Sequence, residues 1–222
     1  MRREALDKLL QKRSEPAPLA TKEITLPEYA EHEVGMIPQL AARFETAAQL
    51  PGAEYLAKLR YLILPIREAD AVPQPLRCKT LLELPRAAFG TVEPDTMRRL
   101  AALEDSDFAG VVANNLAQFG YASPLPVFGG LGLNVTNPMS AAEYVCLGAC
   151  GLLVQPETAL TAMRAVAPRQ KDGTPVPTAA LCYGHLPLML TRACPLRNVR
   201  TSCAGCTHKG KLRDRKGRDF PV

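Results

Sequence analysis

Three cysteines close to the C-terminal end of the chain have the spacing of metal ligands. Cys203 and Cys206 form a C-x-x-C motif with small residues between them, and Cys194 precedes this motif with eight residues between. Thiolates at such spacing bind zinc in structural sites and hold iron–sulfur clusters. We therefore predict a metal or iron–sulfur site built on these three side chains.

A four-coordinate site needs one more ligand, and the identity of that ligand separates two chemistries. A zinc ion would complete a Cys3His set with His208. An iron–sulfur cluster would take a fourth thiolate, either from Cys182 or from a residue beyond Val222. The sequence leaves these alternatives open. We interpret the other three thiols, Cys78, Cys146 and Cys150, as small apolar residues of the core.

The same C-terminal segment is strongly basic. From Arg192 to Val222 there are nine Lys or Arg and two Asp, a net charge of +7, whereas the whole chain carries +5 and the rest of it therefore −2. A nearly neutral body with one basic end is typical of a protein with a local anionic partner such as nucleic acid. A solubilising tail is the alternative. We expect substrate contacts from Arg192, Arg213, Arg215 and Lys216.

The elements that position these groups follow a repeating pattern. A short helix is expected over 2–13 and a polar connector over 14–35, after which apolar runs alternate with segments of helical spacing. This alternation predicts an α/β fold in which parallel (β/α) repeats form a TIM-barrel-like or partial barrel domain; an open doubly wound sheet is the competing architecture. The expected strands are 61–66, 80–84, 108–113, 127–134, 151–154 and 178–182, and the expected helices are 46–59, 94–104, 139–148 and 157–166.

This organisation divides the chain into an N-terminal helix and connector (1–35), a barrel-like domain (36–190) and a Cys-rich basic segment (191–222). In a barrel, functional side chains gather in loops that follow the strands. His185 follows the last expected strand, and we assign it a catalytic role. Asn134 and Asn137 follow an earlier strand, where they would contact substrate or build the turn before Pro138.

Composition and missing motifs exclude several classes. No apolar run is long enough for a membrane helix and no export signal opens the chain, so we expect no membrane association and a cytoplasmic location. The phosphate-binding loop, the dinucleotide fingerprint and the HExxH and GxSxG motifs are all absent from the sequence. The run Gly129-Gly-Leu-Gly132 indicates a bulge or a close backbone approach rather than a phosphate cradle.

Five stretches resemble the collagenase-like peptidase family, U thirty-two in peptidase classification. Three lie at the C-terminal end: Tyr183–Pro195, Cys203–Cys206 and Leu212–Val222. Two others, Arg2–Leu10 and Leu131–Asn137, are similar to the longer members. The resemblance implies that the chain corresponds to the C-terminal region of such members, with the N-terminal barrel supplied by a longer protein or a partner subunit.

The resemblance also implies a barrel-like fold and a [4Fe–4S] cluster, with Cys194, Cys203 and Cys206 as three of its ligands. The family's fourth cysteine usually follows the position at which this sequence ends. Several members support oxygen-independent hydroxylation of RNA, so the expected function is an iron–sulfur-dependent protein or auxiliary domain for hydroxylation of tRNA or rRNA. A collagenase-like peptidase and a zinc-stapled binding module without enzymatic activity are the alternatives.

Overall fold

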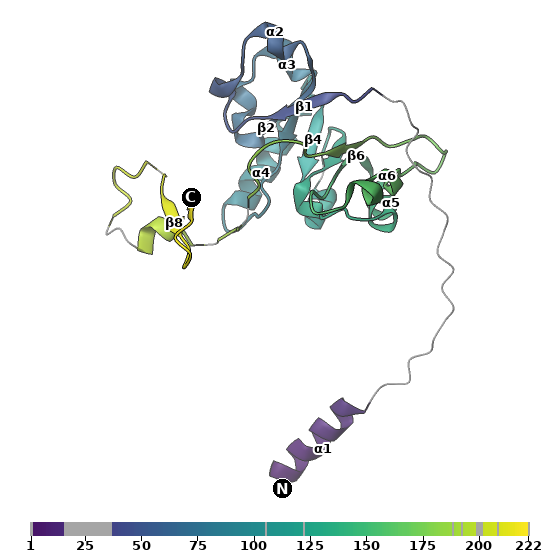
Figure 1. Ribbon diagram of the computed structural model, residues 1–222, viewed down its shortest axis with the longest axis vertical. Coiled ribbons are helices and arrows are strands. Elements are labelled where there is room, and N and C mark those ends of the chain that lie inside the picture. Colours follow the sequence, from purple (N-terminus) through teal and green to yellow (C-terminus); the bar gives the residue numbers. More distant parts are fainter. Residues whose placement is uncertain are drawn as a thin grey trace.

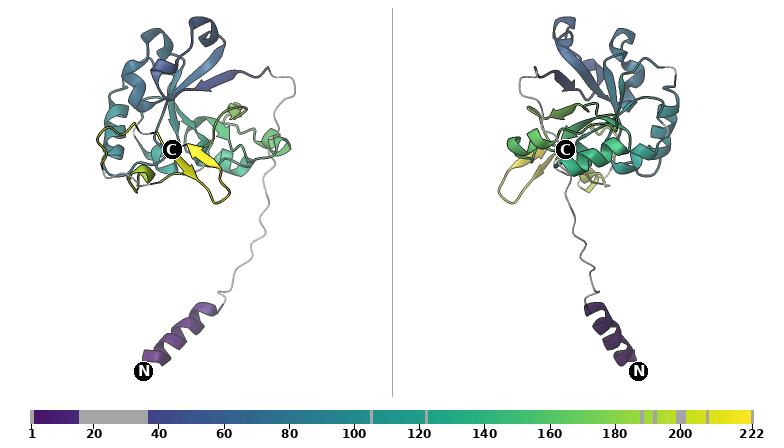
Figure 2. Two further views of the ribbon diagram at one scale, coloured as in Figure 1. Left: turned by 60° about the vertical axis from the view of Figure 1, so that its left-hand side comes forward. Right: turned by 90° about the vertical axis from the view of Figure 1, so that its right-hand side faces the viewer.

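A curled, seven-stranded parallel sheet forms the body of the computed structural model (Figure 1; Figure 2). The strands follow one another in chain order, and each neighbouring pair is parallel. A doubly wound sheet would reverse its strand order, so the half-barrel confirms the partial-barrel prediction. The structure describes residues 2–15, 37–104, 106–121, 123–187, 189–191, 193–198, 202–207 and 209–221.

The apolar runs of the sequence account for most of the sheet, because parallel strands are buried on both faces. The first strand, over 40–43, was not among the predicted strands, and the predicted strand 127–134 ends at Gly129. The strands are β1 (Leu40–Arg43), β2 (Leu59–Pro65), β3 (Thr80–Glu83), β4 (Gly110–Ala113), β5 (Val127–Gly129), β6 (Ala149–Val154) and β7 (Thr178–Ala180).

Short helical segments connect the strands. The predicted helix 46–59 is wrong as one element, because Pro51 and Gly52 interrupt it between a 3-10 turn and a single α-helical turn. The helices are α1 (Arg2–Ser14), α2 (Ala53–Leu56), α3 (Gln74–Arg77), α4 (Val92–Ala101), α5 (Pro138–Cys146) and α6 (Leu160–Ala165), and the 3-10 turns are η1 (Ala47–Gln49), η2 (Ile66–Ala71), η3 (Leu116–Gly120), η4 (Leu131–Leu133) and η5 (Pro195–Asn198).

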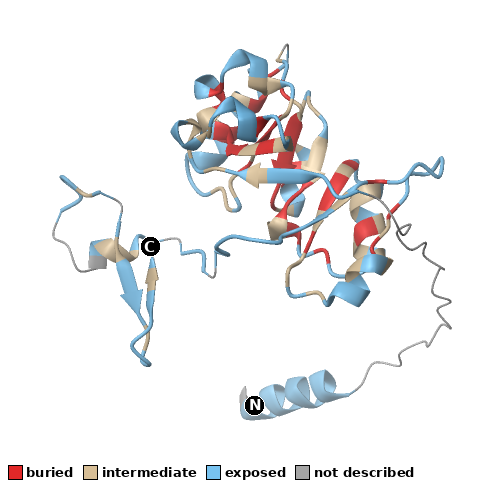
Figure 3. Cartoon of the chain, turned by 45° about the horizontal axis from the view of Figure 1, so that its top comes forward, coloured by how far each residue is buried: buried red, intermediate tan, exposed pale blue. Residues whose placement is uncertain are grey.

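Buried side chains concentrate along the sheet in two clusters (Figure 3). One cluster includes Leu64 and Leu82 of neighbouring strands together with Leu100 of α4. The other includes Leu152 of β6 and Ala141 of α5. The clusters place the core between the sheet and its covering helices, which is the arrangement that a barrel wall requires.

Aromatic side chains show how strongly the sheet curls. The rings of Tyr61 on β2 and Phe128 on β5 have centroids 5.8 Å apart, although two strands separate them in the sheet. Gly110 and Gly151 leave room for the Phe128 ring, because a Cβ at either position would overlap it. Small residues on the strands beside β5 therefore let one ring fill the concave side.

Outside the half-barrel, residues 211–221 form a hairpin that was not predicted. Its strands, β8 (Lys211–Arg213) and β9 (Asp219–Pro221), pair antiparallel. The described side chains of α1 are all exposed. Within the described part of the chain, no helix has the length and apolar character needed to cross a membrane.

The prediction that three thiols are core residues is wrong. Cys78 and Cys146 are exposed, and Cys150 is only half-buried. Cys146 is the last residue of α5 and Cys78 follows α3 directly, so both lie at helix ends instead of facing the sheet. Small apolar neighbours in the sequence did not distinguish a helix end from the core.

Candidate functional site

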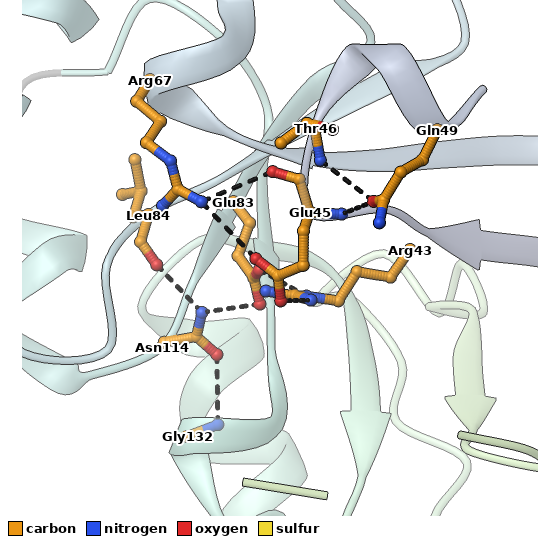
Figure 4. Close-up of polar contacts among 9 residues, drawn as sticks. All are labelled: Arg43, Glu45, Thr46, Gln49, Arg67, Glu83, Leu84, Asn114 and Gly132. Atoms are coloured by element: carbon orange, nitrogen blue, oxygen red, sulfur yellow. Dashed lines mark hydrogen bonds and ion pairs between the residues drawn. The ribbon is translucent and has the colours of Figure 1, made fainter. Parts of the chain in front are cut away.

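Polar side chains from three strands meet where these strands end. Arg43 closes β1, Glu83 closes β3 and Asn114 directly follows β4, and Figure 4 shows them in one connected network. The carboxyl end of the strands is the face on which barrel enzymes carry their functional groups. We therefore treat this network as the candidate site of the half-barrel.

Arg43 links two carboxylates at the rim of this network. Its Nε lies 2.7 Å from Glu83 Oε2, and its Nη1 lies 2.6 Å from Glu45 Oε1. Burial alone would lower the pKa of Arg43, but the hydrogen bond and charge of Glu45 and the charge of Glu83 outweigh it and raise that pKa. The guanidinium is charged, and about half of the side chain is open to solvent.

Arg67, which follows β2, is the most exposed cation of the network. Its Nη2 lies 3.5 Å from Glu45 Oε2, and its Nε lies 3.9 Å from Glu68 Oε1. Such long, exposed contacts contribute little to stability. Because a guanidinium binds carboxylates and phosphates in a bidentate way, this side chain can exchange its weak partners for an anionic ligand.

Asn114 is the buried centre of the network. Its Nδ2 donates to Glu83 Oε1 (3.2 Å) and to the Leu84 carbonyl (3.0 Å), while its Oδ1 accepts from the Gly132 backbone N–H (3.2 Å). One side chain thus joins the residues after β3, β4 and β5. Its own backbone N–H donates to Gln118 Oε1 at 2.6 Å, which fixes the loop after β4.

The glycine run after β5 is explained by this junction. A Cβ on Gly130 or Gly132 would overlap Asn114, so the backbone can approach this side chain only without side chains of its own. The pairing of β5 with β6 is also irregular between Val127 and Gly129. Both observations confirm the predicted bulge or close backbone approach.

The acidic side of the rim predicts a pH-dependent contribution to stability. The hydrogen bond from Arg43 holds the pKa of Glu45 below its ordinary value of 4.5, helped by the charges of Arg43 and Arg67 and opposed by burial. Between the lowered pKa of Glu45 in the folded chain and its ordinary value, the unfolded chain therefore binds more protons than the folded chain. The stabilisation is present above about pH 4.5 and is lost as the pH falls through the folded-state pKa.

We expect Glu45→Gln to lower the free energy of unfolding by about 0.5 kcal/mol at neutral pH, and the difference from wild type to be smaller at about pH 3. Urea unfolding at the two pH values measures both differences. Glu54→Gln, at an exposed position of α2, serves as the control for loss of a surface carboxylate. If Glu45→Gln has the same effect at both pH values, the assignment of a lowered pKa to Glu45 is contradicted.

The predicted site residues of the barrel lie after η4, at the start of α5 and after β7. Asn134 lies after η4 with a left-handed backbone (φ 52°), and its Oδ1 accepts from Gln155 Nε2 at 3.3 Å. Asn137 caps α5, its Oδ1 accepting from the Ser140 N–H at 2.9 Å, which is the turn-building alternative. His185 is exposed in the segment after β7.

Sequence reasoning missed the three central residues of the network, Arg43, Glu83 and Asn114. Each is the first strongly polar residue at the end of an apolar strand, and this signal was present in Leu81-Leu-Glu83 and in Val111-Val-Ala-Asn114. Their contacts join positions 31 and 40 residues apart, so only the curl of the sheet brings them together.

The Cys203–Cys206 pair occupies a single tight turn. The Cys206 N–H donates to the Cys203 carbonyl at 3.2 Å, and Gly205 supplies the left-handed residue of the turn (φ +68°). Cys194 begins another turn, in which its carbonyl accepts from the Arg197 N–H at 3.1 Å. Cys182, Cys194 and Cys203 are exposed, and Cys206 is half-buried.

The metal site predicted from Cys194, Cys203 and Cys206 stays a prediction. The Cys203–Cys206 turn has the small-residue spacing that a thiolate pair needs to hold one metal centre. Within the described ranges, however, no three Cys, His, Asp or Glu side chains gather closely enough to hold a metal ion. His208 and Arg192 lie outside the described residues.

Three of the four predicted basic contacts, Arg213, Arg215 and Lys216, lie on the β8–β9 hairpin. Arg213 on β8 pairs with Asp219 on β9, its Nε lying 2.7 Å from Asp219 Oδ1. Between the strands, Asp214 Oδ1 accepts from the N–H groups of Lys216 and Arg218, both at 2.8 Å. The turn therefore has a defined conformation and presents the exposed side chains of Arg215, Lys216 and Arg218.

Comparison with known proteins gives one distant likeness. No family model matches the chain, and no curated protein matches it. Among solved structures, the chain is similar to the U32 peptidase Mk0906, with a TM-score of 0.41 and 13% sequence identity over 65% of this chain and 73% of that chain.

Proposed function

We propose that this chain is an RNA-binding iron–sulfur protein, and that it serves as the auxiliary domain of an enzyme for oxygen-independent RNA hydroxylation. The observation that carries the proposal is the position of the Cys203–Cys206 turn, directly before a hairpin whose turn presents three exposed cations. Metal ligands and phosphate-binding side chains thus share one short segment.

In the proposed site, Cys203 and Cys206 hold the cluster together with Cys194. The fourth ligand is Cys182 or a residue outside this sequence. These thiols take little part in packing, and ligand assembly is commonly coupled to metal binding. These three cysteines therefore need not be assembled around a common point before the cluster binds. A cluster supplies redox or activating chemistry when bound.

The first experiment is metal and sulfide analysis with a visible absorption spectrum, on full-length protein purified without oxygen. Iron with acid-labile sulfide and broad visible absorption is the expected result. One zinc per chain without colour would instead identify a structural thiolate site, and loss of that zinc in His208→Ala would assign its fourth ligand. Protein without any metal contradicts the proposal.

We expect Arg215→Glu/Lys216→Glu to weaken RNA binding, because phosphate contacts by these side chains release condensed counterions. The dependence of log K on log salt should become less steep by about 1.4, the sum of two single-strand contacts. Titration of a fluorescent single-stranded RNA at several salt concentrations measures this slope.

The matched control is Lys58→Glu/Lys171→Glu, which changes the net charge equally at exposed positions of the half-barrel. If both double variants lose affinity to the same extent, the interaction follows net charge and the hairpin is not the RNA contact.

A further inference from the structure

The outer side of the sheet is left uncovered next to its last strand. An open groove of about 180 Å³ lies between α6 and β7. Val154, Leu160, Met163 and Arg164 form one wall, and β7 (Thr178–Ala180) forms the other. Its exposed surface is mostly apolar, and Leu160 is 70% exposed.

The position of this groove indicates what kind of element would fill it. In a (β/α) barrel, the helix that follows each strand packs on the outside of the sheet. Along the described residues after β7, the next helical segment is the short η5 turn. The groove is thus the place at which a parallel sheet, which is ordinarily covered on both faces, lacks a helix.

Helix α1, in turn, exposes an apolar face. Leu6, Leu9 and Leu10 lie at i, i+3 and i+4 on one face and are 61%, 58% and 55% exposed. A helix of 13 residues is marginal in water by itself and gains its stability by packing an apolar stripe. Packing of these leucines on an apolar surface would stabilise the helix.

We propose that the leucine stripe of α1 docks into the groove between α6 and β7 of the same chain. The 21 residues from 16 to 36 join α1 to the half-barrel. Fully extended, they span at most about 70 Å, whereas a domain of this size has a radius of gyration of about 15 Å. The tether therefore allows α1 to reach the groove.

The tether also favours the intramolecular contact over a contact between two copies. A segment joined by a linker of this length has an effective concentration of about 1 mM near its own groove. A second copy at micromolar concentration competes poorly with it. Docking would bury leucine side chains against Leu160 and Met163 and would cover β7 in the way that α4 and α5 cover their strands.

Photo-crosslinking of the full chain tests this docking. Benzoylphenylalanine at position 9 is expected to crosslink within one chain to peptides that contain 154–164 or 178–180, as mapped by mass spectrometry. Benzoylphenylalanine at position 8, on the opposite face of α1, is the matched control. Leu160→Ser, at an exposed position whose loss leaves the core intact, should reduce the position 9 crosslink several-fold.

Hydrogen exchange supplies a second measurement. Leu6→Ser/Leu9→Ser/Leu10→Ser should speed the exchange of amides in α6 and β7 by about tenfold, as expected when a covering element is lost, whereas Lys8→Ser should not. The proposal is overturned if exchange is unchanged in the triple variant and position 9 gives no crosslink to the groove. It is likewise overturned if the crosslink joins two chains, which denaturing electrophoresis shows as a dimer.

Discussion

If Cys203 is a ligand of the proposed cluster, its replacement with serine is expected to leave less than about a tenth of the iron and acid-labile sulfide of the wild-type chain, because each cluster iron needs its thiolate ligand. A serine hydroxyl is nearly isosteric with the thiol, but it stays protonated at neutral pH and binds iron weakly. The change is confined to an exposed turn. Loss of the cluster would therefore reflect the missing ligand rather than unfolding of the half-barrel.

Cys206→Ser should behave in the same way, since both thiols belong to the single turn closed by the Cys206 N–H and the Cys203 carbonyl. The matched control is Cys78→Ser, which alters another exposed thiol, beside α3. This variant should retain the full iron content. Metal analysis and visible absorption of the three variants, purified without oxygen, measure these differences.

The three variants also separate the metal site from the RNA contact. If the Cys203 and Cys206 variants lose iron and keep their RNA affinity, the hairpin binds phosphate independently of the cluster. If RNA affinity falls with the iron content, the cluster orders the segment that holds the hairpin. Cys203→Ser protein with unchanged iron would exclude this turn as the ligand pair.

The sheet could be predicted from the sequence because its central strands are buried. The β-rich run Tyr61-Leu-Ile-Leu-Pro-Ile66 and the run before Glu83 are continuous apolar segments, as parallel strands require. The strand over 40–43 was not predicted because Leu40 is its single large apolar residue and the strand lies at the sheet edge. An edge strand is specified mainly by its neighbour, which a local pattern does not report.

The candidate site was less accessible to sequence reasoning because it depends on the curl of the sheet. Asn134 and Asn137 were selected from a loop with many polar residues, and Asn137 serves as a helix cap. Asn114, by contrast, looked like one amide in an Asn-Asn pair after an apolar run. Only the approach of the glycine turn after β5 shows that it connects three strands.

The importance of this junction leads to the largest expected effect within the half-barrel. We expect Asn114→Leu to lower the free energy of unfolding by about 4 kcal/mol, because leucine fills a similar volume but offers no hydrogen bond. The substitution leaves the Leu84 carbonyl and the Gly132 N–H without their partner. The Leu84 carbonyl is buried and the Gly132 N–H is half-buried. An orphaned buried group costs about 1–3 kcal/mol.

Urea and thermal unfolding measure this loss, and the melting temperature should fall by about 10 °C for a domain of this size. Asn115→Ala is the matched control, since Asn115 is more exposed and caps the short η3 turn, a role worth about 1 kcal/mol. If Asn114→Leu costs no more than this control, the polar junction does not hold the strand ends together. In that case apolar packing alone would determine the arrangement of Arg43 and Glu83.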